Sequence, residues 1–179
     1  MQARISEVLD YLDTQRAALE RTLSEVPAKL RERRPSAESW SVAEVLQHLE
    51  LTEARIADVI AGCIERARSP YVGRESETSP VSRTFDIERV LDRQRPVVAA
   101  DAVLPREALD AEAAWERLEL RRAKLRDLVI SADGLALAKV TAPNRVLGPL
   151  DGYQWILFVG AHEARHTGQI REIAELLRS

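Results

Sequence analysis

The sequence predicts an all-α fold, a four-helix bundle, from three observations. Good helix formers (Ala, Leu, Glu and Arg) dominate the composition. Aromatic residues make up only 4% of the 179 residues and there are only 7 glycines, whereas a many-stranded sheet favours aromatic side chains and needs glycines in its turns. Four long segments carry apolar residues at helical spacing. We therefore expect one domain over residues 1–179, with four helices of similar length packed as a bundle.

The first two predicted helices fill the N-terminal third of the chain. The first covers roughly residues 2–25, where apolar residues recur at intervals of three, four and seven, and Pro27 follows it. The second starts at Ser41, because Ser41 and Glu44 form a capping-box pattern, and it continues to about Ala67.

The other two predicted helices lie in the C-terminal half. The third covers roughly residues 107–131, and the fourth begins near Asp151, its expected cap, and continues to Leu177. A loop over residues 132–150 joins them. Neither this loop nor its flanks show a strong strand pattern.

A long crossover, residues 68–107, separates the second and third helices. Its residues 85–91 have the pattern of a short helix. A connection of this length inside a compact domain is unusual and is often functional. The crossover contains four prolines, which are Pro70, Pro80, Pro96 and Pro105.

Composition excludes several classes of partner and compartment. The net charge of −3 does not match the basic surface of a nucleic-acid-binding protein. The single cysteine, Cys63, allows no intramolecular disulfide, and the N-terminal residues lack the apolar run of a secretory signal. The longest apolar run, Trp155 to Ala161, is far shorter than the ~20 residues of a membrane span. We therefore expect a cytoplasmic protein with neither nucleic acid nor membrane among its partners.

The three histidines carry the strongest chemical signal. With Trp155 set at 0° on the fourth helix, His162 falls at about 340° and His166 at about 20°, in the middle of the apolar stripe. His48 falls on the flank of the apolar stripe of the second helix. Buried imidazoles need partners, and one shared metal ion would satisfy all three. The sequence thus predicts a divalent metal site made by His48, His162 and His166.

Two other interpretations of these residues stay open. A single histidine near a core, such as His48, is more often a hydrogen-bonded packing residue than a ligand. The segment from His162 to His166 also matches H-E-x-x-H, in which two histidines bind zinc and the glutamate is a general base. Too few residues follow His166 to supply the usual third ligand, so we expect Glu163 to be a solvated helix residue, with a base role toward metal-bound water left open.

Two segments resemble signatures of the DinB-like superfamily. The first is RPSAESWSVAEVLQHL at residues 34–49, and the second combines GPLDGYQW at residues 148–155 with H-x-x-x-H-T-G-Q-I at residues 162–170. The resemblance implies a four-helix bundle in down-up-up-down order and a homodimer. It also implies nickel, zinc or iron bound by three histidines that match His48, His162 and His166.

The same resemblance implies metal-dependent chemistry on small molecules. The superfamily includes transferases that use a low-molecular-weight thiol, a thiol-dependent isomerase and proteins called metal-dependent hydrolases. Three protein ligands leave open coordination positions for a thiolate or a water. A non-catalytic metal-binding stress-response module is the alternative. Arg145, Arg165 and Arg171 are candidates to bind a charged cosubstrate, and Gln169 is a candidate hydrogen-bond partner of a ligand histidine.

The start of the fourth helix also supports the homodimer. Residues 155–158 (Trp-Ile-Leu-Phe) point in all directions around the helix, so this turn is expected to be covered on every side. A second subunit is the predicted cover, and the 68–107 crossover is the alternative.

Overall fold

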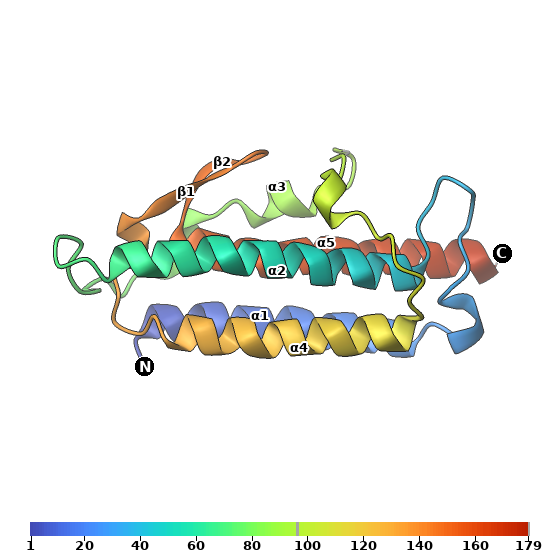
Figure 1. Ribbon diagram of the computed structural model, residues 1–179, viewed down its shortest axis with the longest axis horizontal. Coiled ribbons are helices and arrows are strands. Elements are labelled where there is room, and N and C mark those ends of the chain that lie inside the picture. Colours follow the sequence, from blue (N-terminus) through green and yellow to red (C-terminus); the bar gives the residue numbers. More distant parts are fainter. Residues whose placement is uncertain (96, 179) are drawn as a thin grey trace.

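The computed structural model describes residues 1–95 and 97–178, so Pro96 of the crossover and Ser179 lie outside the described residues. Four long helices lie side by side (Figure 1). The predicted all-α four-helix bundle is therefore confirmed. The long helices are α1 (Ala3–Ser24), α2 (Val42–Ala67), α4 (Ala111–Ile130) and α5 (Gly152–Arg178).

Helix direction explains the long crossover. α1 and α5 run one way and α2 and α4 run the other, which is the down-up-up-down order (Figure 1). A parallel pair such as α2 and α4 needs a connection that returns along a whole helix, and the 26 residues of α2 span about 39 Å. The crossover holds the short helix α3 (Ile87–Leu91) and two 3₁₀ turns, Val81–Thr84 and Asp101–Val103.

Side-chain caps fix where three of the helices begin. Ser41 and Glu44 form both hydrogen bonds of the predicted capping box. The Asp151 Oδ1 accepts from the Gln154 N–H at 2.9 Å, as expected of the α5 cap. The prediction for α4 was wrong by four residues at its start, because Asp110 caps the helix by accepting from the Ala113 N–H at 2.8 Å. Residues 107–110 therefore belong to the crossover.

The 132–150 loop contains a β-hairpin that the sequence did not indicate. Strands β1 (Thr141–Asn144) and β2 (Gly148–Asp151) pair antiparallel, after a 3₁₀ turn at Leu137–Lys139. Pro143 lies opposite Pro149 in the register. Proline is excluded from central strands but tolerated at an edge, and both strands of an isolated hairpin are edges. The two prolines therefore obscure the strand signal in the sequence, although they do not prevent the two strands from pairing.

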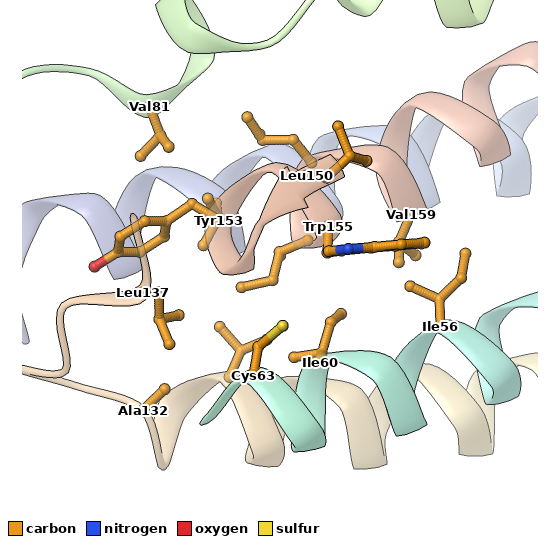
Figure 2. Close-up of a cluster of buried hydrophobic side chains, with 14 of the residues drawn as sticks. Ile56, Ile60, Cys63, Val81, Ala132, Leu137, Leu150, Tyr153, Trp155 and Val159 are labelled. Atoms are coloured by element: carbon orange, nitrogen blue, oxygen red, sulfur yellow. The ribbon is translucent and has the colours of Figure 1, made fainter. Parts of the chain in front are cut away.

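Two apolar clusters form the core, one toward each end of the bundle. Figure 2 shows the cluster at the α5 N-terminal end, where Tyr153 and Trp155 pack against Ile60 and Cys63 of α2. The second cluster lies near the α5 C-terminus and includes Ile170. Between these clusters lies a layer of buried charged residues with one member from each long helix, and Glu50 of α2 is buried as well. The four members of the layer are Arg16, Glu53, Arg122 and Glu163.

The apolar turn at the start of α5 is already covered within one chain. Trp155 is 5% exposed and its Nε1 donates to the Ala142 carbonyl of β1 at 3.2 Å. Ile156 and Leu157 are fully buried. The hairpin, the bundle and the crossover, whose Val81 and Phe85 belong to the same buried cluster, thus provide the cover that motivated a second subunit. The homodimer stays a prediction that rests on the family resemblance. Among the helices of residues 1–95 and 97–178, none combines the length and apolar character of a membrane span.

Candidate metal centre

The three predicted ligands meet at one point between α2 and α5. His162 and His166 lie one turn apart on α5, and their ring centroids are 4.5 Å apart. The His48 ring packs against both, with centroid distances of 5.3 Å to His162 and 4.8 Å to His166. One potential ligand atom from each residue lies within 4.8 Å of the others. The helical-wheel prediction that the three imidazoles share one interior space is therefore correct.

Hydrogen bonds on the outer nitrogens orient two of the rings. The His48 Nδ1 lies 2.8 Å from the Val103 carbonyl, which can only accept, so Nδ1 carries the proton. The His166 Nδ1 lies 2.7 Å from the Gln169 Oε1. In both rings Nε2 is then the unprotonated nitrogen. The His166 Nε2 lies 3.2 Å from the His162 Nε2, close enough to accept a hydrogen bond from it.

Burial keeps the imidazoles neutral. Burial lowers the pKa of His48, although the hydrogen bond to Val103 partly opposes it. Burial lowers the pKa of His166 to about 3, and the neighbouring His48 adds to the effect. The pKa of His162 is well below its usual value because of burial and then because of the other two histidines and Arg165. Neutral imidazole is the form that binds a metal ion.

Glu163 is not the solvated residue that the sequence suggested. It is 1% exposed, and its Oε2 accepts from Arg16 Nη2 at 2.7 Å and from Arg122 Nη2 at 3.0 Å. At 100° per residue it points about 100° away from His162, into the charged layer at the bundle centre. Both arginines come from other helices, α1 and α4, which a pattern within α5 cannot reveal. Glu163 therefore stabilises the bundle, and its carboxylate is engaged on the side away from the imidazoles.

The three candidate cosubstrate arginines all have protein partners. Arg165 donates to the carbonyls of Val90, Asp92 and Arg95. Arg145 donates to the Val98 carbonyl, whereas Arg171 donates to the Thr22 hydroxyl of α1. Arg165 and Arg145 thus connect the hairpin and α5 to the crossover. Arg145 and Arg171 are exposed and each makes one such bond, so their role toward a cosubstrate stays a prediction.

The site also contains groups that the sequence analysis missed. The Val103 carbonyl is one, and a backbone acceptor in a loop leaves no signal in a sequence. Trp40 packs against His48 at 5.0 Å, and Phe158 packs against His162 at 5.8 Å between centroids. Phe158 lies one turn before His162 on the same helical face, so the i, i+4 spacing was a usable signal. The predicted hydrogen bond between Gln169 and a ligand histidine is present, with His166.

The donor set fits a divalent metal ion. Three imidazoles, each with a ring nitrogen within 4.8 Å of the other two, suit zinc, nickel, copper and iron. Three ligands from the protein leave coordination positions open for a small molecule, as in catalytic rather than structural zinc sites. The outer hydrogen bonds of His48 to the Val103 carbonyl and of His166 to the Gln169 side chain match the usual support of metal-binding histidines, which fixes both the tautomer and the ring orientation.

Fold and site together define a helical-bundle protein with a three-histidine centre compatible with a divalent metal ion. Comparison with known families identifies it further: the family model of the DinB superfamily matches residues 11–170, and the chain belongs to this superfamily. It is similar to the uncharacterized protein YuaE of Bacillus subtilis (strain 168), with 30% identity over 143 residues, covering 79% of this chain and 82% of YuaE. The crystal structure of the four-helix bundle protein TT2238 shares the fold, with a TM-score of 0.61 and 20% identity over 94% of this chain and 98% of TT2238.

Proposed function

We propose that the protein binds one divalent metal ion through His48, His162 and His166 and uses it to transfer a low-molecular-weight thiol to an electrophile. Nickel and zinc are the first candidates and iron also fits the donor set. The observation that carries the proposal is the convergence of three imidazoles, two of which, His48 and His166, already have their outer nitrogens held by Val103 and Gln169. Such a centre is arranged before any ligand arrives.

The residues of the site would have separate roles in such an enzyme. A bound divalent ion would act as a Lewis acid that favours the thiolate form of a coordinated thiol. His162 and His166 form a chelating pair on one helix, and His48 closes the site from α2. Trp40 and Phe158 place aromatic rings beside His48 and His162. With a metal bound, the thiol would lose its proton to solvent, its sulfur would bond to a carbon of the electrophile, and the leaving group would depart with the electron pair of the broken bond.

Thiol transfer is favoured over hydrolysis by the position of Glu163. An H-E-x-x-H hydrolase needs this glutamate as a general base beside the metal. Here its Oε2 is bound by two arginines in the charged layer. A thiol nucleophile needs no such base once it is a thiolate. A non-catalytic metal-binding module is the remaining alternative, and an activity measurement decides against it or for it.

The metal site is tested first and by itself. Elemental analysis of the purified protein identifies the metal, and calorimetric titration of chelator-treated protein with Ni²⁺ and Zn²⁺ measures affinity. We expect His48→Ala to bind at least tenfold more weakly than wild type and to lose most of the thermal shift caused by metal. Gln47→Ala is the matched control, because Gln47 is equally buried on α2 but bonds to Glu107 of the crossover. Equal affinity of His48→Ala and wild type would refute the site.

The thiol reaction is tested with the metal loaded. Monochlorobimane is the electrophile, because a thiolate displaces its chloride and the product fluoresces. We expect turnover with one of a panel of low-molecular-weight thiols that includes bacillithiol and mycothiol. Turnover must disappear on chelation and return with metal. Metal binding without turnover for any thiol and electrophile pair would instead support the non-catalytic module.

A homodimer and a cytoplasmic location complete the proposal. Both rest on the family resemblance and on the composition. Light scattering over a range of concentrations tests the first, since a monomer mass at the highest concentration refutes it. Cell fractionation tests the second.

A further inference from the structure

Two buried side-chain atoms in the described part of the chain lack a hydrogen-bond partner; one residue lies one turn after His48 on α2, and the other follows His162 in the sequence. They are Thr52 Oγ1 and Glu163 Oε1. The other oxygen of Glu163 accepts three N–H groups, so that carboxylate is well stabilised despite its free atom. Thr52 has a single side-chain oxygen and no such compensation. An unsatisfied buried hydroxyl is costly and calls for a reason.

Other helical threonines of this protein behave differently. A threonine inside a helix commonly donates to the carbonyl four residues earlier. Thr14, Thr22 and Thr167 all do so, at 2.7, 3.0 and 2.9 Å. The corresponding acceptor for Thr52 is the carbonyl of His48, yet the Thr52 hydroxyl does not bond to it. The Thr52 hydroxyl is therefore available for another partner.

Helix geometry places Thr52 on the face of α2 that carries His48. Thr52 follows His48 by four residues, so the two side chains share one face of α2. α2 and α5 run in opposite directions (Figure 1), and His48 packs against both His162 and His166. One turn beyond His48 on α2 therefore corresponds to one turn earlier on α5, toward His162 and Phe158. Thr52 thus lies on the α2 side of the site, opposite the aromatic wall that Phe158 forms against His162.

From this placement we infer that the Thr52 hydroxyl is the protein's hydrogen-bond donor to the thiolate ligand of the centre. The inference rests on the proposed metal site and deepens it by naming the residue that recognises the ligand. A hydroxyl that donates to an anionic sulfur favours the thiolate over the neutral thiol. The free protein keeps an unpaired hydroxyl buried, and the ligand supplies the missing partner. Thr52 is accordingly a positioning residue. Its unpaired hydroxyl lowers the stability of the free protein and strengthens the binding of the ligand.

Metal-free protein gives the first test, independent of any ligand. Thr52→Val removes the unpaired hydroxyl and keeps the branched shape, so we expect the melting temperature to rise by about 2–4 °C. Thr22→Val is the matched control, because Thr22 is also buried but its hydroxyl bonds to Ala18 and Arg171. This control should lower the melting temperature. A fall for Thr52→Val similar to that of Thr22→Val would show that the hydroxyl already has a protein partner, and would overturn the inference.

Cobalt-loaded protein gives the second test. Co²⁺ replaces the native metal, and titration with 2-mercaptoethanol is followed by the thiolate-to-cobalt absorption band. We expect Thr52→Val to bind Co²⁺ as wild type does but to bind the thiol about tenfold more weakly, the loss expected for one hydrogen bond to a charged group. Thr52→Ser retains the hydroxyl and should stay within about threefold of wild type.

The outcomes separate the two proposals. Failure of wild type to bind Co²⁺, read before any thiol is added, refutes the metal site and the Thr52 role with it. Equal thiol affinity of wild type and Thr52→Val refutes the Thr52 role alone. Loaded wild type without a thiolate band refutes the thiol ligand and therefore this role as well.

Discussion

The buried charged layer allows a quantitative test of how this bundle is held together. Arg16, Glu53, Arg122 and Glu163 come from four different helices and carry a net charge of zero. Arg122 bonds both oxygens of Glu53, at 3.0 and 3.1 Å, while Arg16 bonds mainly to Glu163. Burial by itself would lower the pKa of Arg16, but Glu163 and Glu53 outweigh it and raise that pKa. Charge balance is therefore the condition under which these groups can be buried.

Replacing Glu163 by Leu breaks the balance. Two guanidinium groups then share one buried carboxylate, Glu53, and Arg16 keeps only the half-exposed Glu119 as a further carboxylate partner. Removing one partner of a buried ion pair costs about 3–5 kcal/mol, because the remaining charge stays buried without compensation. The double variant Arg16→Met/Glu163→Leu restores neutrality and leaves the bidentate pair of Arg122 and Glu53 intact. Its loss should be smaller than that of Glu163→Leu alone, with a coupling energy of about 2–3 kcal/mol.

Urea unfolding of metal-free protein measures these values, provided the m-values of the variants agree. The matched control is the ion pair of Asp13 and Arg126, which also joins α1 to α4 but is substantially exposed, at 51% and 34% of the side chains. Asp13→Ala should cost less than about 1 kcal/mol. A loss below 1 kcal/mol for Glu163→Leu, or a double variant whose loss equals the sum of the single losses, would refute the role of charge balance.

Three further predictions concern acid, the crossover and helix contact. Burial lowers the pKa of the site histidines below the unfolded value of about 6.5, so the unfolded chain takes up protons first as pH falls. The histidines therefore do not reduce the free energy of unfolding above about pH 6.5. At pH 5.5, metal-free protein should lose about 1 kcal/mol of this free energy for each imidazole that stays neutral in the folded state, as measured by urea unfolding. A free energy of unfolding that does not change between these pH values would contradict this prediction. Arg165→Gln should speed proteolysis within residues 92–103, whereas Arg171→Gln should not, as followed by mass spectrometry. Gly160→Ala should lower the free energy of unfolding by about 1–3 kcal/mol, because the new Cβ would lie 2.6 Å from the Tyr11 ring. Gly62→Ala is the control: its Cβ would lie 3.7 Å from its nearest neighbour, so the free energy of unfolding should rise by about 0.5–1 kcal/mol.

Predictions from the sequence were most accurate where the interacting residues lie within one segment of the chain. The capping box of Ser41 and Glu44 fixed the start of α2 because both partners lie within one turn. The periodicity of α5 placed His162 and His166 in its buried stripe, and their spacing made them meet. The family resemblance supplied the helix order, which periodicity alone does not determine.

Failures occurred where the deciding partner lies far away in the chain. Glu163 looked like a surface residue because its arginines lie on α1 and α4. The hairpin escaped notice because Pro143 and Pro149 face each other, a pairing that only the register reveals. The cover of residues 155–158 was expected from a second subunit or from the crossover. Crossover residues such as Val81 do belong to the same buried cluster, but the cover of Trp155 by β1 was not foreseen. In each case the missing information was a long-range contact, which local propensity does not contain.

The five residues from His162 to His166 show how such contacts decide function. The H-x-x-x-H spacing presents both imidazoles to α2 whatever the rest of the bundle does, because it depends on helix geometry alone. The role of the glutamate between them depends on what it meets on its own face. Here Arg16 and Arg122 hold it in the charged layer, so the motif provides two ligands and one bundle-forming charge. Glu163→Gln should consequently change the affinity for metal by less than about threefold while it lowers the free energy of unfolding, since the amide keeps the shape but removes the charge. If metal affinity fell as far as in His48→Ala, the carboxylate would belong to the metal centre, and the separation of the two faces of α5 would be wrong.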